Sequence, residues 1–484
     1  MGGGDLPVRV AAVVLAAGKG TRFSSELAKV LHPAAGRTML RWVLEALRPL
    51  GLERVVVVVG HQADAVTAEA EAARLDRLST VVQAEQLGTG HAVRSAVDSG
   101  ALDGIDTAMV LPGDVPLLTP EPLRLLIETH GRTAATLLTA RLGDPTGYGR
   151  VVRDPDGAVA RVVEHRDATA EERAVDEVNT SIYAFALPSL ARELARLSAA
   201  NDQGEQYLTD VIAPLVPEGV GAVVVAGADV QGVNDRVQLA AAATVLRRRI
   251  LERLMRDGAT IVDPATTYVG AEVAVAADAV LLPGTHLEGT TRVAARATVG
   301  PDSRLVDTVV EEGATVTYSV LTGARVGSGA NVGPFTYLRP GADLRARSKA
   351  GAFVEMKNAV VGEGSKVPHL SYIGDAEIGR GANIGAATVT VNYDGYDKHR
   401  TVVGDGARVG SDTMLIAPVR VGNDAYTGAG SVITSDVPDG ALAVERTEQR
   451  NIAGYAERRA ARHERDREAA GDAAIRPPPS EPEG

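Results

Sequence analysis

A six-residue period runs through the second half of this chain and limits its fold more than any other feature. Aliphatic residues recur at every sixth position after Gly258, and Gly or Ala follows many of them. This period is typical of a parallel β-helix, in which the aliphatic side chain points into a narrow prism and the small residue fits a tight corner. Seven successive matches in register are more than chance or an ordinary β-sandwich would give. The positions in frame are Val269, Val275, Leu281, Leu287, Val293, Val299 and Leu305, then Val326, Val332, Leu338 and Leu344, then Ile378 and Ile384, and finally Val403, Val409, Leu415 and Val421.

The frame breaks around Val309–Tyr318, Lys349–Asn358 and Asn392–Arg400. Insertions in a solenoid leave it as loops, and such loops often carry function. We therefore predict three loops that leave the β-helix at these places.

The first half of the chain has a different pattern. Short apolar runs at Val10–Ala16, Val55–Val59 and Ala108–Leu111 are typical of buried parallel strands, and Leu40–Leu47 and Ala63–Leu75 of the helices between them. The alternation predicts a Rossmann-like α/β domain with a mostly parallel sheet. Ligands of such sheets bind in the loops at the carboxyl ends of the strands.

The change of period divides the chain into segments. Leu246, Ile250 and Leu254 share one face of a helix that Gly258 would end. From about Ala456 the composition is rich in Arg, Glu and Ala and ends in Pro, which is typical of a disordered tail with room for a short helix. We predict an α/β domain over 1–238, a linker helix over 239–257, a β-helix over 258–455 and a disordered tail over 456–484.

Composition excludes several classes of function. The 484 residues are 45% hydrophobic but only 3% aromatic, so the cores must use Ala, Val, Leu and Gly, which suits tight repetitive layers. A net charge of −12 argues against nucleic-acid and anionic-membrane partners. The absence of cysteine excludes disulfides and thiolate chemistry. No signal-peptide pattern or membrane-length apolar run is present, so a cytoplasmic protein is expected.

The loop Leu15–Phe23 follows the first predicted strand. Its glycines let the backbone approach a nucleotide closely, and Lys19 and Arg22 add positive charge beside phosphate. An ordinary strand-to-helix turn also contains glycine, so the loop alone leaves both readings open. The GxxxxGK[ST] pattern of a P-loop is absent.

Further motifs follow this loop in a fixed order. They are Lys29–Pro33, Gln83–Ala92, Gly113–Leu118, Gly147–Arg150, Val163–Glu164, Glu177–Thr180 and Gly232–Asn234. Together they resemble the uridyltransferase half of the bifunctional N-acetylglucosamine-1-phosphate uridyltransferase/glucosamine-1-phosphate acetyltransferase family. The resemblance runs from about Val8 to Tyr455. It implies a nucleotidyltransferase domain followed by a left-handed parallel β-helix.

The resemblance implies roles for named residues. A sugar 1-phosphate is already an anion that attacks the α-phosphorus of UTP without a general base, so positioning and charge neutralisation suffice. Asp114 and Asn234 are the expected ligands of Mg²⁺, although an isolated Asp114 is equally typical of a turn, Glu164 of surface charge and Asn179 of a turn cap. The residues implied for UTP and the sugar phosphate are Leu15, Ala16, Ala17, Gly18, Arg22, Lys29, Gln83, Gly88, Thr89, Gly113 and Asn234, with Gly149, Glu164 and Asn179 around the amino sugar.

Two residues depart from the family pattern. Pro112 precedes Gly113-Asp114 where the family often has a residue with a backbone N–H, so a contact through that group is lost. Asp235 follows Asn234 where a second Asn is common, and it is expected to add negative charge near the metal.

Acetyl transfer makes a different demand, because the amine of glucosamine-1-phosphate must lose a proton before it attacks a thioester. A base with a pKa near neutrality favours histidine. His369 lies within Lys366–Asp375, whereas His286 and His399 have unremarkable neighbours. A lone histidine is more often structural, but Gly333–Pro340, Val354–Asn358, Asn383–Ala386 and Val391–Gly395 resemble the acetyltransferase half of the same family. The implied roles are His369 as general base, Arg339, Lys357, Tyr372 and Asn383 for glucosamine-1-phosphate, and Ala386, Asn392, Tyr393, Ser411, Ala429 and Arg446 for acetyl-CoA.

Arg446 also fits an exposed tail arginine, and Ala429 could offer only its backbone.

Three hypotheses remain for the whole chain. The first is the bifunctional enzyme, which acetylates glucosamine-1-phosphate and then converts N-acetylglucosamine-1-phosphate and UTP to UDP-N-acetylglucosamine and pyrophosphate. The second is a nucleotidyltransferase whose β-helix only assembles or regulates it, and the third is a non-catalytic scaffold. The resemblance also implies a homotrimer with active sites between subunits.

Overall fold

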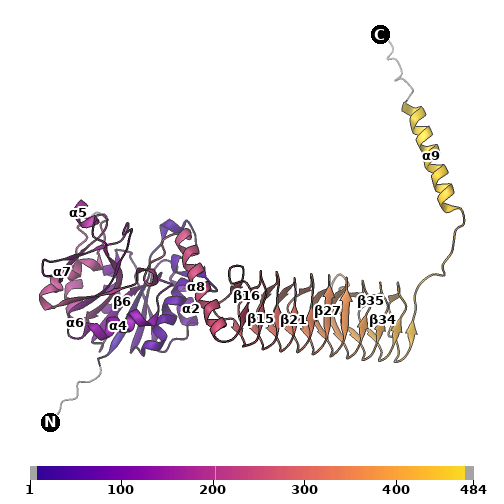
Figure 1. Ribbon diagram of the computed structural model, residues 1–484, viewed down its shortest axis with the longest axis horizontal. Helices are drawn as coiled ribbons and strands as arrows, with labels where there is room; N and C mark the ends of the chain where they lie inside the picture. Colours follow the sequence, from indigo (N-terminus) through magenta and orange to yellow (C-terminus); the bar gives the residue numbers. More distant parts are fainter. Residues whose placement is uncertain (1–7, 202, 475–484) are drawn as a thin grey trace, which may run out of the picture.

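The computed structural model describes residues 8–201 and 203–474. An α/β domain lies at one end, a long prism of short strands extends from it, and a single helix projects beyond the far end of the prism (Figure 1). This arrangement confirms the predicted combination of a mostly parallel α/β domain and a parallel β-helix.

The α/β domain is built on a mixed sheet in the order β11-β7-β10-β6-β1-β4-β5. Neighbours are parallel except at β10, which runs antiparallel to both β6 and β7. An antiparallel hairpin of β8 and β9 joins β10. The strands are β1 (Val10–Ala16), β4 (Arg54–Val59), β5 (Leu78–Val82), β6 (Thr107–Pro112), β7 (Ala135–Arg141), β8 (Arg150–Arg153), β9 (Val159–Val163), β10 (Glu177–Ala186) and β11 (Val220–Val225).

Helices cover both faces of this sheet because its central strands are apolar on both sides. Ala12 and Val14 of β1 pack with α1, α2 and α4, whereas Ala11 and Val13 pack with α3, α6 and α7. Both faces are therefore dry, as a parallel sheet requires. The helices are α1 (Met39–Leu47), α2 (Ala63–Ala72), α3 (Thr89–Asp98), α4 (Pro120–His130), α5 (Ala170–Arg173), α6 (Leu187–Leu194) and α7 (Ile212–Leu215).

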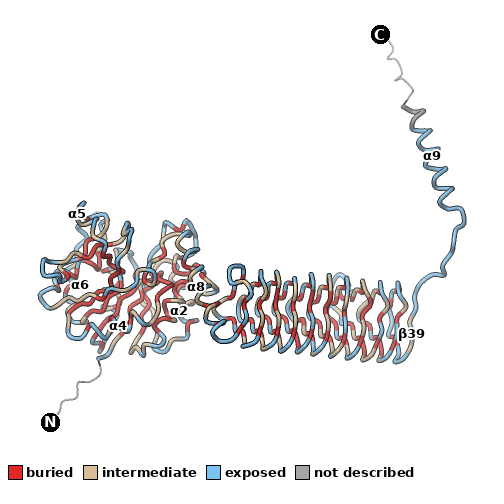
Figure 2. The backbone as a smooth tube through the Cα atoms, in the orientation of Figure 1, coloured by how far each residue is buried: buried red, intermediate tan, exposed pale blue. Residues whose placement is uncertain are grey.

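The β-helix repeats every three hexapeptides. Tyr268 pairs with His286 and Val280 with Thr298, so each strand lies beside the strand of the next coil, and all these pairings are parallel. The in-frame side chains stack inside the prism, where Leu281, Val299 and Leu305 are fully buried; Figure 2 shows this interior as buried backbone along the prism. The longer strands are β27 (Lys349–Ala352), β28 (Glu355–Val361), β29 (Lys366–His369) and β30 (Tyr372–Ile378), and the other strands from β12 (Thr260–Ile261) to β39 (Leu442–Ala443) have two or three residues.

Two of the three predicted loops are wrong. Val309–Tyr318 and Lys349–Asn358 stay within the prism, because Arg292 pairs with Val309 and Lys349 with Lys366, each pair one position short of three full hexapeptides. Each break in the frame is a shortened turn, so the coil closes without a loop. Only the third segment leaves the prism: Ala376 pairs with Thr401, more than a hexapeptide beyond the regular spacing, and the extra chain forms a hairpin over 392–399.

Helix α8 (Arg236–Arg256) occupies the place of the predicted linker over 239–257 and packs on both domains. Ile250 and Leu254 belong to the β-helix core, whereas Ala242 and Leu246 pack with Phe23 of the α/β domain.

The last helix, α9 (Tyr455–Ala474), begins at the predicted boundary of the tail. The disordered tail predicted over 456–484, with room for a short helix, is thus a 20-residue helix as far as Ala474, and positions 475–484 lie outside the described residues. None of the helices within 8–201 and 203–474 combines the length and apolarity that crossing a bilayer would need.

Candidate functional site

The loops at the carboxyl ends of β1, β4, β5 and β6 meet at one edge of the sheet. His61 N donates to Ala17 O (3.1 Å), Gln83 N to Val59 O (2.7 Å) and Gly113 N to Leu15 O (2.9 Å). A Cβ at Gly60 would lie 2.9 Å from the Ala17 Cβ. The predicted residues Leu15, Ala16, Ala17, Gly18, Gln83 and Gly113 therefore line one continuous edge, where an α/β sheet binds its ligands.

Four predicted residues form a charged cluster at this edge. The Lys29 Nζ contacts a carboxylate oxygen of Asp114 and lies 3.0 Å from Asn234 Oδ1. Arg22 Nη2 donates to the same Asn234 oxygen at 3.2 Å. Only 14% of the Lys29 side chain and 20% of the Asp114 side chain are exposed, so solvent screens the pair weakly. Gly20 permits this geometry, because a Cβ there would lie 2.5 Å from the Lys29 Cβ.

The two departures from the family pattern have structural explanations. The Asp235 carboxylate accepts a hydrogen bond from Gln238 N (2.8 Å) and so caps the N-terminus of α8, where negative charge is favourable. Gly113 N faces β1, and successive N–H groups of a strand point to opposite sides, so an N–H at position 112 would face β10. The pairing of β10 with β6 already ends at Val110 and Tyr183. Pro112 therefore costs no sheet hydrogen bond.

The start of α3 is held by side chains and by a close backbone approach. Gln83 is buried, and its Nε2 donates to Gly88 O (3.1 Å). Gly88 has φ 109°, and a Cβ there would lie 2.6 Å from Gln206 O, so only glycine fits. The Thr89 hydroxyl accepts from Leu208 N (3.1 Å). The predicted uridine residues at this turn are thus locked to the segment that contains Gln206.

A third group surrounds Glu164. Thr209 Oγ1 donates to Glu164 Oε1 (3.1 Å), and burial raises the pKa of this carboxyl. Asn179 is buried: its N donates to Gly149 O (2.9 Å) and its Nδ2 to the Tyr183 hydroxyl (2.7 Å). These contacts show that Glu164 is not simple surface charge. The Asn179 Oδ1 also accepts a hydrogen bond from Ser181 N at 3.3 Å. Asn179 therefore caps a turn in addition to making its other contacts.

Glu164→Gln should change how stability depends on pH. Because burial raises the folded pKa of Glu164 above the ordinary 4.5, the protonated form is favoured in the folded state. Folded stability is therefore largest below the unfolded pKa and falls as pH rises through the folded pKa. Urea unfolding between pH 4.5 and 8 should show Glu164→Gln gaining stability relative to the wild type as pH rises. A constant difference across this range would contradict the buried carboxyl.

The predicted acetyltransferase residues divide between two corners of the prism. His369 ends β29, and no hydrogen bond or ion pair of its imidazole is found among the described residues. Its carbonyl accepts from Ala387 N at 3.3 Å, which places the next coil at the same corner. Tyr372, at the start of β30, follows the turn at Leu370.

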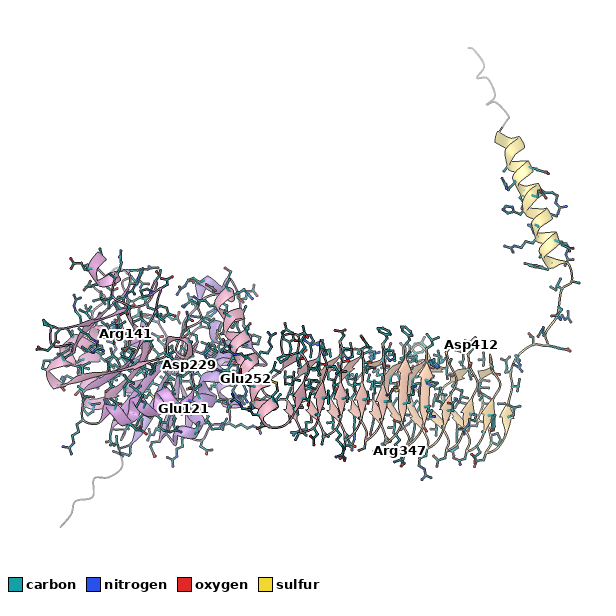
Figure 3. All side chains as sticks on the ribbon, in the orientation of Figure 1. Glu121, Arg141, Asp229, Glu252, Arg347 and Asp412 are labelled. Atoms are coloured by element: carbon teal, nitrogen blue, oxygen red, sulfur yellow. The ribbon has the colours of Figure 1, made fainter. Side chains whose placement is uncertain are left out.

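Four of the predicted acetyl-CoA residues continue the His369 corner toward the end of the prism. Asp412 N donates to Ala386 O (2.7 Å), Gly430 N to Ser411 O (2.8 Å) and Arg446 Nη1 to Ala429 O (3.1 Å). Asp412 lies on the edge of the prism opposite Arg347 (Figure 3). Through its hydrogen bond to Ala429, Arg446 is therefore held at the corner where Ala386, Ser411 and Ala429 stack. Asn383 lies in β31 (Asn383–Ile384), where it pairs with Lys366 at the start of β29, the strand that His369 ends.

The remaining predicted residues lie near the opposite corner of the same face. Arg339 and Lys357 occupy equivalent positions in successive coils, and Arg339 Nη1 donates to Glu355 Oε1 (2.9 Å). The neighbouring Lys398 ammonium lowers the pKa of Lys357. Asn392 and Tyr393 begin the hairpin over 392–399. Within one chain, the cations predicted to bind phosphate and His369 are thus separated along the face.

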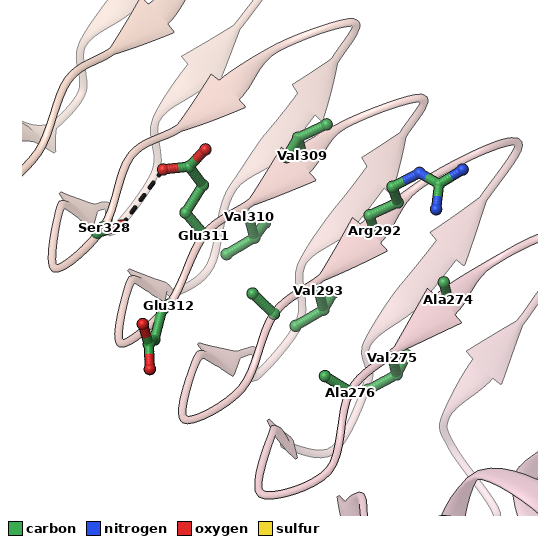
Figure 4. A pocket seen from close by; sticks show the side chains of 11 residues that line it. Ala274, Val275, Ala276, Arg292, Val293, Val309, Val310, Glu311, Glu312 and Ser328 are labelled. Atoms are coloured by element: carbon green, nitrogen blue, oxygen red, sulfur yellow. Dashed lines mark hydrogen bonds between the residues drawn. The ribbon is translucent and has the colours of Figure 1, made fainter.

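A separate hollow crosses the first coils of the β-helix. It measures about 510 Å³ and is lined by Val275, Val293, Val310 and Glu311, with Glu311 hydrogen-bonded to Ser328 (Figure 4). None of the residues predicted to bind a substrate lines it. The predicted sites are instead open edges and corners.

Sequence reasoning missed several residues that contact the predicted ones. Thr209 and Tyr183 hold Glu164 and Asn179, and Asp375 holds Asn392. The only feature of the sequence that pointed to Asp375 was its position shortly after His369. Its hydrogen bond with Asn392 depends on which coils stack on each other. Asp375 and Asn392 lie in different coils and become neighbours only through the stacking of the β-helix.

Comparisons with known proteins cover both domains. A MobA-like NTP transferase domain model matches residues 12–215, and a bacterial transferase hexapeptide (six repeats) model matches residues 400–435. Among solved structures, a UDP-glucose pyrophosphorylase complexed with UDP-glucose covers 50% of this chain and 99% of its own, at 15% identity and a TM-score of 0.40, which is too low to bear on this chain.

Sequence relatives extend over nearly the whole chain. The bifunctional protein GlmU of Streptomyces avermitilis is 53% identical over 458 residues, which cover 93% of this chain and 94% of that protein. The protein of the same name from Thermobifida fusca is 53% identical over 457 residues, with the same coverage. That of Mycolicibacterium vanbaalenii is 50% identical over 459 residues, 93% of each chain. The chain therefore belongs to the GlmU family of bifunctional uridyltransferases and acetyltransferases that make UDP-N-acetylglucosamine.

Proposed function

We propose that the charged cluster at the sheet edge is the uridyltransferase site and that the β-helix face beside His369 is the acetyltransferase site. The first reaction moves UMP from UTP to N-acetylglucosamine-1-phosphate, and the second moves an acetyl group from acetyl-CoA to glucosamine-1-phosphate. The observation that supports this assignment best is the convergence of Arg22, Lys29, Asp114 and Asn234, from four separate segments, on one edge of the sheet.

The uridyltransferase site suits Mg²⁺. A carboxylate oxygen of Asp114 and the amide oxygen of Asn234 both contact a single cation, the Lys29 ammonium. Carboxylate and amide oxygens with substrate phosphates are the ligands that Mg²⁺ prefers. No group of three His, Cys, Asp or Glu side chains with metal-site geometry occurs in the described part of the chain, so phosphate oxygens would complete the set. When bound there, Mg²⁺ would neutralise charge on the phosphates of UTP.

The side chains of the uridyltransferase site position charge and do not transfer a proton. N-acetylglucosamine-1-phosphate attacks as an anion, so no base is needed at this edge. Arg22 and Lys29 would draw the phosphates together and stabilise negative charge in the transition state. Glu164 and Asn179, fixed by Thr209 and Tyr183, would hold the amino sugar.

In the acetyltransferase site, His369 would take the proton that the amine of glucosamine-1-phosphate must lose. Its imidazole is exposed and has no partner among the described residues, so a nitrogen is free to accept. Arg339 and Lys357 would bind the phosphate, and Tyr372 and Asn383 the sugar. Ala386, Asn392, Tyr393, Ser411, Ala429 and Arg446 would hold acetyl-CoA. UTP and acetyl-CoA as substrates also support a cytoplasmic location.

A single incubation tests both assignments. Purified protein is mixed with glucosamine-1-phosphate, acetyl-CoA, UTP and Mg²⁺, and the sugar nucleotide is identified by mass. UDP-N-acetylglucosamine is the expected product. Uridyl transfer from supplied N-acetylglucosamine-1-phosphate without any acetylation would instead favour a β-helix that only assembles or regulates the enzyme.

We also propose that the chain works as a homotrimer. Tyr318, Phe335, Phe353 and Leu370 form an apolar ladder at the His369 corner, 43%, 57%, 59% and 60% exposed. The Phe335 and Phe353 rings stack at 5.3 Å between centroids. An exposed apolar strip of this kind marks a contact with another protein surface. A second copy packed on the ladder would also bring its own Arg339 and Lys357 toward His369. In one chain alone, these cations and His369 lie apart.

Phe353→Lys tests this association. The substituted residue has φ 59°, which is equally unfavourable for Phe and Lys, so folding should change little while the ladder gains a charge. Sedimentation at micromolar concentration should show the trimer shifted mostly to monomer, with acetyl transfer reduced and uridyl transfer retained. Tyr426→Lys, which changes an exposed aromatic residue on another face, is the matched control. An unchanged trimer in Phe353→Lys would contradict the role of the ladder.

A further inference from the structure

The hairpin over 392–399 is held together by hydrogen bonds between its own residues. Asp394 accepts from the backbone N of Tyr396 (2.8 Å) and Asp397 (2.7 Å) and lies 2.7 Å from His399 Nε2. These bonds give the hairpin a shape of its own. They do not determine where it lies on the β-helix, so that placement depends on its two ends.

The two ends of the hairpin are attached very differently. Arg400 Nη2 donates to Glu377 Oε2 at 2.9 Å, but both side chains are more than half exposed. Asn392 Nδ2 donates to Asp375 Oδ2 at 2.5 Å, and Asn392 is only 8% exposed. Exposed ion pairs contribute little, whereas a buried amide on a carboxylate is strong and costly to leave unpaired. The Asp375 contact is therefore the stronger of the two side-chain attachments.

Asp375 connects three successive coils of the prism. Its other oxygen accepts from Asn358 Nδ2 at 2.6 Å, in the coil before it, as Asn392 lies in the coil after it. Asp375 also lines a hollow of about 260 Å³ between the hairpin and the prism, together with Asn358, Lys398 and Arg400. The carboxylate thus lies between the hairpin and the rigid scaffold.

The charge of Asp375 is maintained by these neighbours. Burial alone would raise the pKa of the carboxyl. The hydrogen bonds from Asn358 and Asn392 outweigh that effect, and nearby Lys398 and Lys357 add to them, so the pKa lies below its ordinary value. An ionised Asp375 accepts from both amides at once, which a neutral acid would do less well.

We propose that Asp375 is a positioning residue of the acetyltransferase site, which holds Asn392 and with it the hairpin that presents Tyr393 to acetyl-CoA. This inference rests on the proposed acetyltransferase function. Asp375 does not touch the reacting atoms. It acts through Asn392, so removing it should weaken acetyl-CoA binding in the ground state and in the transition state alike, which raises KM and leaves kcat nearly unchanged.

A double-mutant cycle on the full chain tests this role, with CoA thiol release as the assay. Asp375→Ala should raise the KM for acetyl-CoA about tenfold, which corresponds to loss of one buried charge-assisted hydrogen bond. In the Asn392→Ala background the same change should add less than about twofold, since residues that act through one contact are not additive. Asp375→Asn should also raise this KM, because its amide has a single acceptor oxygen for the two amides that donate to Asp375.

Two controls separate positioning from general stability. Asp307 is another corner aspartate with positive φ, hydrogen-bonded to Thr290 far from the hairpin, so Asp307→Ala measures the cost of losing such a residue. Arg400→Ala removes only the exposed attachment and should leave KM within about twofold. A normal KM in both Asp375 variants, or independent effects of Asp375→Ala and Asn392→Ala, would overturn the proposal. A wild type that does not acetylate would instead overturn the proposed function on which it rests.

Discussion

His369→Ala is expected to slow acetyl transfer by about 10²- to 10⁴-fold, the usual contribution of a general base. The amine of glucosamine-1-phosphate is mostly protonated near neutral pH, and the exposed imidazole of His369 is the group we expect to accept its proton. Uridyl transfer should stay within about twofold of the wild type, because that reaction needs no base. The two activities are measured separately on one preparation, as CoA thiol release and as pyrophosphate release.

The pH profile distinguishes a base from a structural histidine. Acetyl transfer by the wild type should change with pH, and the residual activity of His369→Ala should lack the part of that change that depends on the base. His286→Ala is the matched control, since His286 stacks on Tyr268 at 4.6 Å in a coil far from the proposed site. Equal loss of both activities in His369→Ala would contradict the assignment of two separate sites.

The hexapeptide period was enough to predict the β-helix, but it could not show how the coils close. The breaks near Val309 and Lys349 look like insertions in the sequence, whereas in the structure they shorten a turn. Non-glycine residues such as Tyr318 and Phe353 adopt positive φ at these corners. A shortened turn and an extruded loop interrupt the frame in the same way, so only three-dimensional pairing separates them.

The cluster that we propose as the uridyltransferase site was predictable residue by residue because each member lies in a recognisable motif. Lys29, Asp114 and Asn234 are far apart in sequence. Asp114 follows β6, Lys29 begins a short 3-10 helix and Asn234 precedes α8, and the fold brings these three segments to one edge of the sheet. The direction in which a side chain points was not predictable. Asp235 was expected to add charge near the metal, yet its carboxylate caps α8. Asp375 was missed because its partner Asn392 is adjacent only after the coils stack.

Asp114→Asn is expected to reduce uridyl transfer by about 100- to 1,000-fold, the usual effect of removing one group that stabilises transition-state charge. The substitution keeps the shape of the side chain but removes its negative charge. It leaves Lys29 without its carboxylate partner and would leave Mg²⁺ without the anionic ligand that we propose for it. Pyrophosphate release in the presence of excess N-acetylglucosamine-1-phosphate is the measurement, repeated over a range of Mg²⁺ concentrations.

The dependence on Mg²⁺ identifies the cause of that loss. If Asp114 holds the metal, Asp114→Asn should need a higher Mg²⁺ concentration for half-maximal rate, and a chelator should stop uridyl transfer in the wild type while acetyl transfer continues. Asp235→Asn is the matched control, because asparagine also caps a helix and the change removes one negative charge next to Asn234. If Asp235→Asn shifted the Mg²⁺ requirement as far as Asp114→Asn did, the metal would respond to net charge at this edge and not to the Asp114 carboxylate.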